Sequence, residues 1–118
     1  NPEDGSYGPT IITRHDVSLP AHVGSSKSEA LQTIWVLHGH LQMKSLDGLS
    51  VGQSFKSGDT IAWIGAEHEN GGWPPHLHIQ LSISEPIVND MPGVVKFEER
   101  RSALEQYPDP RLILGQLY

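Results

Sequence analysis

Apolar and polar residues alternate in two segments of this chain, and each segment contains a pair of histidines. The first segment, residues 33–41, reads Thr-Ile-Trp-Val-Leu-His-Gly-His-Leu. Successive side chains of a β-strand point to opposite faces, so this alternation predicts a strand. One face of this strand is expected to carry Ile34, Val36, His38 and His40, and the other to carry Trp35, Leu37 and Leu41.

The second segment follows a turn rich in glycine and proline and reads His-Leu-His-Ile-Gln-Leu at residues 76–81. His76, His78 and Gln80 are expected on one face, opposite an apolar face of leucine and isoleucine that packs in a core. A half-buried strand with a polar face is the simpler interpretation of either histidine pair alone. Two pairs on neighbouring strands favour convergence of the imidazoles, which suits a metal ion, a proton-transfer site or both.

The rest of the chain is rich in turns. A third strand is expected at 10–15, a polar loop at 16–29, and short strands on either side of the turn Ser-Gly-Asp at 57–59. Helix-forming residues predict a short helix within 96–106, with Phe97, Ala103 and Leu104 facing inward. The apolar residues of 111–118 either pack against the domain or lead into another one.

Composition narrows the fold class. A chain of 118 residues is expected to form one domain, and 36% apolar residues with 12 glycines and 9 prolines favour short strands and many turns. We therefore expect a mostly β protein. No apolar stretch is long enough for a membrane span, and no signal-peptide pattern is present at the start. The opening Asn-Pro-Glu-Asp-Gly, without methionine, is typical of the interior of a longer protein.

Charge and cysteine content limit the chemistry. The chain has no cysteine, so a metal would have to be held by His, Asp or Glu. The net charge is −6, and Arg100-Arg101 is the only basic cluster. Nucleic acid and membrane surfaces are therefore not expected partners.

Four motifs resemble those of the lysostaphin/LytM-type zinc metallopeptidases, in order and spacing, over roughly residues 5–83. They are Tyr-Gly-Pro-Thr-Ile-Ile at 7–12, Leu-His-Gly-His-Leu at 37–41, Val-Gly-Gln through Gly-Asp-Thr-Ile at 51–61, and Pro-His-Leu-His at 75–78. The resemblance implies an antiparallel β-sheet of the barrel-sandwich type, the duplicated hybrid motif. It also implies a β domain at 1–83 that lacks its N-terminal strands, followed by an extension or linker with a short helix at 84–118.

The same resemblance implies an activity and residue roles. Family members hydrolyse peptide bonds in peptidoglycan cross-links with a bound zinc ion. Carried over, His78 is a zinc ligand, His76 is a catalytic histidine, and His40 is its partner. Trp73 and Asn70, in the loop before the second histidine pair, are expected to line the substrate groove for a peptide or a peptidoglycan-like substrate.

Two departures from the family pattern concern the metal. The upstream His-x-x-x-Asp motif is absent, so two of the three expected ligands are missing, and the chain is expected to be either a fragment or a degenerate copy. His38 stands where the family has tyrosine. It is a candidate substitute ligand, although the simpler interpretation is that one hydrogen-bonding side chain replaces another.

Residues 91–94 and 107–115 are similar to the segment that follows this domain in fusions with class III aminotransferases. A parent of that kind would be cytoplasmic, and otherwise a periplasmic or extracellular protein is expected. Three functions remain open: a zinc peptidase with an incomplete zinc site, a non-catalytic binding or regulatory domain that contacts other domains of a parent enzyme, and a phosphocarrier domain with two active histidines. The string Pro-Pro-His-Leu-His argues against the phosphocarrier.

Overall fold

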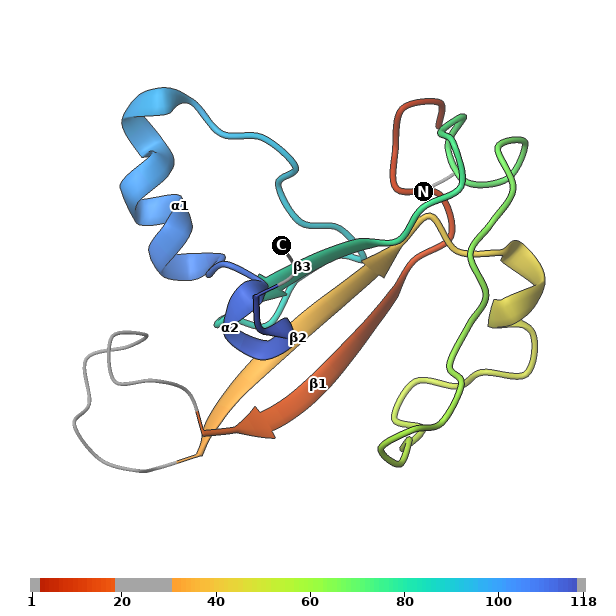
Figure 1. Ribbon diagram of the computed structural model, residues 1–118, viewed down its shortest axis with the longest axis horizontal. Coiled ribbons are helices and arrows are strands. Elements are labelled where there is room, and N and C mark those ends of the chain that lie inside the picture. Colours follow the sequence, from red (N-terminus) through yellow and green to blue (C-terminus); the bar gives the residue numbers. More distant parts are fainter. Residues whose placement is uncertain (1–2, 19–30, 117–118) are drawn as a thin grey trace. The chain divides into compact units, whose positions relative to one another are not determined.

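The computed structural model describes residues 3–18 and 31–116. Three strands, β1 (Ile11–Val17), β2 (Gln32–Gly39) and β3 (His78–Ser82), form one antiparallel sheet with β2 in the centre (Figure 1). Two short α-helices, α1 (Arg100–Gln106) and α2 (Arg111–Leu114), lie near the C-terminal end of the sequence. The chain is therefore mostly β with little helix, as expected. Most of the polar loop expected at 16–29 lies outside the described residues.

The chain divides into two compact units that interleave along the sequence. Unit 1 comprises Asn1–Ile11 and His38–His78, and unit 2 comprises Ile12–Leu37 and Ile79–Tyr118. The expected boundary after residue 83 stays a prediction.

Unit 2 contains most of the sheet and its apolar core. Ile34, Val36 and Leu81 are buried together, and Val17 and Ile79 pack against them. These five residues come from all three strands, and four of them are β-branched, a shape that packs well on a pleated surface. Ile79 and Leu81 were expected in the core, whereas Ile34 and Val36 were expected on the face of their strand that also carries His38.

Hydrogen bonds connect the segment after β3 with that strand and with the residue that follows it. The Gln80 side-chain amide donates a hydrogen bond to the Pro92 carbonyl oxygen over 2.9 Å, and the Ile83 amide donates to the Gln106 carbonyl oxygen over 3.0 Å. A short 3₁₀ turn, η2 (Phe97–Glu99), precedes α1. The short C-terminal helix is confirmed.

The expected inward face of that helix is wrong. Phe97 and Leu104 are 75% and 62% exposed, and only Ala103 is partly buried. The regular α-helix begins at Arg100, so Phe97 lies in the tighter 3₁₀ turn, where helical periodicity does not apply. The Arg100 guanidinium covers the Phe97 ring at 4.8 Å from its centroid.

Unit 1 is built from turns and short backbone pairings. Leu41 and Ile64 form an isolated antiparallel bridge, and a 3₁₀ turn, η1 (Met43–Leu46), follows it. The expected turn near 57–59 is present, because the Lys56 amide donates to the Asp59 carboxylate over 2.8 Å and Gly58 adopts a φ of 89°. The strands expected on either side of this turn are replaced by irregular backbone. No helix in the described ranges is long and apolar enough to cross a bilayer.

Candidate functional site in unit 1

The first histidine pair does not lie on one continuous strand. β2 ends at Gly39, and His40 adopts a φ of 61°, the left-handed conformation that is uncommon for residues other than glycine. The His40 amide donates to the Tyr7 carbonyl oxygen over 2.6 Å, and the His40 carbonyl oxygen accepts from the Gly65 amide over 2.8 Å. Contacts with distant segments therefore impose the bend. The expected strand to residue 41 was too long, and strand alternation does not relate His38 to His40.

Beyond the bend, His40 joins a cluster of rings. Its ring centroid lies 4.3 Å from that of His76 and 6.0 Å from that of His78. Tyr7 lies 4.4 Å from His78, and Trp73 lies 6.2 Å from His40. All five residues belong to unit 1. The structure thus brings together three of the four histidines that the sequence singled out, without His38, and the tryptophan expected beside them.

Hydrogen bonds fix the orientation of two imidazoles in this cluster. His40 Nδ1 lies 2.8 Å from the Asn70 carbonyl oxygen, and His76 Nδ1 lies 2.6 Å from the Pro74 carbonyl oxygen. A carbonyl oxygen only accepts, so Nδ1 carries the proton in each ring and the neutral ring keeps its lone pair on Nε2. The site therefore holds two neighbouring imidazoles in one tautomer, His40 buried and His76 exposed.

Asn70 is fully buried, with 0% of its surface exposed, so it does not line a groove. Its backbone carbonyl oxygen holds His40, and its side chain holds the loop. Its side-chain amide donates to the Gly65 carbonyl oxygen over 3.2 Å and to the Trp73 carbonyl oxygen over 2.8 Å. Its side-chain oxygen accepts from the Trp73 amide over 2.9 Å. Asparagine side chains often close turns through such backbone contacts. The string Asn-Gly-Gly before Trp-Pro-Pro indicates a turn here, but it does not indicate that Asn70 is buried.

The second histidine pair straddles the start of β3. Only His78 lies in the strand, whereas His76 precedes it and Leu77 is 44% exposed instead of buried. Pro74 and Pro75 lack amide hydrogens and cannot extend the strand ladder toward residue 76. The side chain of Trp73 is 44% exposed beside the two rings of His40 and His76, where a bound molecule could reach it.

His38 does not share a face of the sheet with His78. By strand alternation, His38 lies on the face of β2 that carries Ile34 and Val36, whereas His78 lies on the face of β3 opposite to Leu81. Ile34, Val36 and Leu81 form one core, so the two histidines point to opposite sides of the sheet. The strand geometry therefore gives no support to His38 as a substitute ligand for a metal at His78.

The residues present do not fit a zinc site by themselves. In residues 3–18 and 31–116, no group of three or more His, Asp or Glu side chains is arranged to hold a metal ion. Structural and catalytic zinc sites use at least three protein ligands. Among the residues expected at this site, His78 is the candidate ligand that the sequence offers.

A glutamate closes the loop that carries Asn70. The Glu69 carboxylate accepts from the Met43 amide over 2.9 Å and from the Ala66 amide over 3.2 Å. The bond from Met43 is the main cause that lowers the pKa of Glu69 below its ordinary value of 4.5. A lowered folded-state pKa means that the contact stabilises the loop above pH 4.5. This stabilisation is lost as the pH falls through the folded-state value.

No protein family model, curated protein or solved structure matches this chain. What unit 1 does must therefore be inferred from its own residues and their geometry.

Proposed function

We propose that unit 1 is a peptidase-like domain of the lysostaphin/LytM type, with the duplicated hybrid motif as its underlying fold, and that His40 and His76 act on a peptide bond. The observation that carries the proposal is the neighbouring pair of imidazoles, 4.3 Å apart between centroids, each with Nδ1 bound to a backbone carbonyl. Both rings keep Nε2 for chemistry. The loop between Gly65 and Pro75 supplies both carbonyl oxygens.

The two rings would divide the proton transfers of hydrolysis. The exposed His76 takes a proton from the attacking water at Nε2, as its hydrogen-bonded Nδ1 holds the ring in place. The buried His40 would have to carry a second proton, at Nε2, to donate a hydrogen bond to the oxygen of the tetrahedral intermediate. The proton held by His76 then goes to the leaving nitrogen as the carbon–nitrogen bond breaks. Trp73 would contact the substrate, a peptide or a peptidoglycan-like strand, beside these rings.

For zinc, the proposal is limited to His78 as one ligand. A zinc ion would supply Lewis-acid activation of the peptide carbonyl, but its other ligands would have to come from outside the described residues. If they are lacking, the same ring cluster would serve a binding or regulatory domain of a larger enzyme. Peptide hydrolysis and metal content separate the two functions.

The test is hydrolysis of a library of short peptides, with and without added zinc, by the natural full-length protein. His76→Gln and His40→Asn are each expected to reduce kcat at least hundredfold, because general acid–base groups contribute about 10²–10⁴. Asparagine suits position 40 because it tolerates the left-handed conformation and retains an amide donor. His68→Gln, in an exposed part of the same loop, is the control and should retain wild-type kcat.

Metal content gives a second, independent readout of this proposal. Zinc that binds in stoichiometric amount is expected to be lost in His78→Ala and kept in His76→Gln. Hydrolysis that survives in both His40→Asn and His76→Gln would contradict the proposed function. Neither hydrolysis nor zinc in the wild-type protein would favour the binding domain instead.

A further inference from the structure

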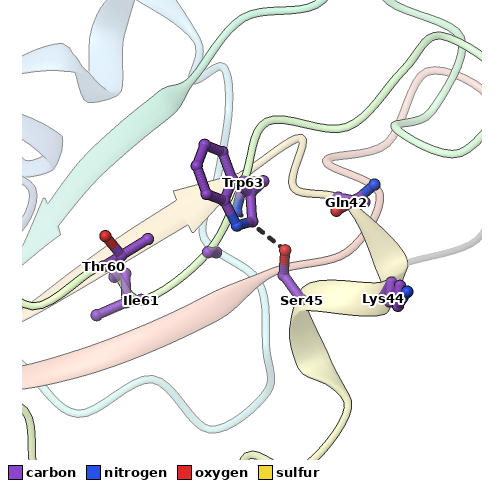
Figure 2. A pocket seen from close by; sticks show the side chains of 7 residues that line it. Gln42, Lys44, Ser45, Thr60, Ile61 and Trp63 are labelled. Carbon is purple, nitrogen blue, oxygen red and sulfur yellow. Dashed lines mark hydrogen bonds between the residues drawn. The ribbon is translucent and has the colours of Figure 1, made fainter.

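A concave surface of unit 1 lies between η1 and the segment 60–63. It is a cleft of about 410 Å³, and seven residues line it: Gln42, Lys44, Ser45, Thr60, Ile61, Ala62 and Trp63 (Figure 2). This volume is within the range of sites that hold small molecules. None of the five residues of the ring cluster lines the cleft.

Two hydrogen bonds hold residue 63 against η1 and Gln42, and several polar side chains around the cleft have no partner within the described residues. The Trp63 amide donates to Ser45 Oγ over 2.9 Å (Figure 2). The Trp63 carbonyl oxygen accepts from the Gln42 amide over 2.8 Å. The side chains of Gln42, Lys44 and Thr60, and the indole N–H of Trp63, form no hydrogen bond or ion pair with the part of the chain that the structure describes. A bound molecule can therefore use these groups without breaking an internal contact.

The chemistry of the lining selects a class of ligand. Trp63 is 69% exposed and offers a broad apolar face, while Lys44 offers one positive charge. Figure 2 shows the Trp63 side chain with Thr60 and Ile61 on one side and with Gln42, Lys44 and Ser45 on the other. No Asp or Glu is among the lining residues, although the chain has a net charge of −6. The cleft thus combines an aromatic face, a cation and several hydroxyl and amide groups.

We propose that this cleft binds a carboxylated sugar. The apolar C–H face of a sugar ring suits the Trp63 indole, its carboxylate suits the Lys44 ammonium, and its hydroxyl groups suit Gln42 and Thr60. A simple anion would not use the indole, and a neutral sugar would not use the ammonium. The proposal does not depend on the function of the histidine cluster, since it concerns different side chains.

The experiment is a titration of the ¹⁵N-labelled protein with glucuronate, followed by the shift of the Trp63 indole N–H signal. Glucose and acetate are the matched probes for the ring alone and the charge alone. Glucuronate is expected to give a saturable shift, with affinity at least tenfold higher than that of glucose or acetate. Trp63→Leu and Lys44→Met should each weaken glucuronate binding at least tenfold. Binding to Trp63→Leu is measured by calorimetry, because this variant lacks the indole N–H signal.

Both variants should fold, because the hydrogen bonds of residue 63 involve its backbone and the Lys44 side chain is exposed. Lys96→Met, which removes an exposed lysine of unit 2, is the control and should bind glucuronate as the wild type does. The proposal is overturned if glucuronate gives no saturable shift, if acetate binds as tightly as glucuronate, or if Lys44→Met retains full affinity.

Discussion

Asn70→Ala is expected to lower the free energy of unfolding by about 3 kcal/mol, because buried polar groups that lose their partners cost about 1–3 kcal/mol each. The substitution removes hydrogen bonds to the Gly65 carbonyl oxygen and to both the amide and the carbonyl oxygen of Trp73. It also leaves space where a fully buried side chain was packed. Urea unfolding of the wild-type and variant proteins measures the difference.

The effect of Asn70→Ala should extend to the ring cluster. The Asn70 carbonyl oxygen holds His40 Nδ1, so movement of the loop releases that ring. Gln116→Ala is the control, since Gln116 carries an exposed side-chain amide in unit 2, and its effect is expected to stay within about 0.5 kcal/mol. Equal stability of Asn70→Ala and Gln116→Ala would contradict the role of Asn70 as the support of the loop.

Gly71→Ala is expected to destabilise the protein by about 3 kcal/mol, and Gly72→Ala by about 1 kcal/mol. The two glycines are adjacent and adopt φ angles of 91° and 82°, so alanine pays a similar backbone cost at each. An added Cβ at Gly71 would collide with the Ser6 carbonyl oxygen, whereas at Gly72 it would meet no atom within 4 Å. The difference between the two variants therefore isolates the steric cost.

That collision would also disturb the N-terminal segment of unit 1. The Gly5 amide donates to the Gly71 carbonyl oxygen over 2.8 Å, and the following residues place Tyr7 against His78. Gly71→Ala should therefore change the NMR signals of Tyr7 and His78, and Gly72→Ala should leave them close to wild type. Equal loss of stability in the two variants, measured by urea unfolding, would show that Ser6 does not pack closely against residue 71.

The sheet could be predicted because local alternation and burial agree in it. Leu81 was expected on an apolar face and lies in the core of unit 2, where it meets Ile34 and Val36 from the strand face expected to carry His38. Strand ends could not be predicted in the same way. The pattern of residues 33–41 continues through His40, but hydrogen bonds with Tyr7 and Gly65 turn the chain there, and no local pattern reveals partners so distant in sequence.

The site could be predicted only in part, because some of its geometry follows from local spacing and some from contacts between distant segments. The spacing of His40, His76 and His78 indicated that the rings meet, and they do. The sequence did not indicate the buried position of Asn70, since an Asn-Gly-Gly string is compatible with an exposed turn. Nor did it indicate that His38 faces away from His78, which depends on how the two strands share one core.

The measurement that most directly tests this account is the tautomeric state of the histidines, read from the ¹⁵N signals of the imidazoles in mildly alkaline solution. The central claim is that backbone carbonyls hold His40 and His76 with Nδ1 protonated and Nε2 free for chemistry. We predict protonated Nδ1 and unprotonated Nε2 for both residues, with this preference lost for His40 in Asn70→Ala. Protonated Nε2 in either residue, or a mixture of tautomers as in free histidine, would contradict the claim.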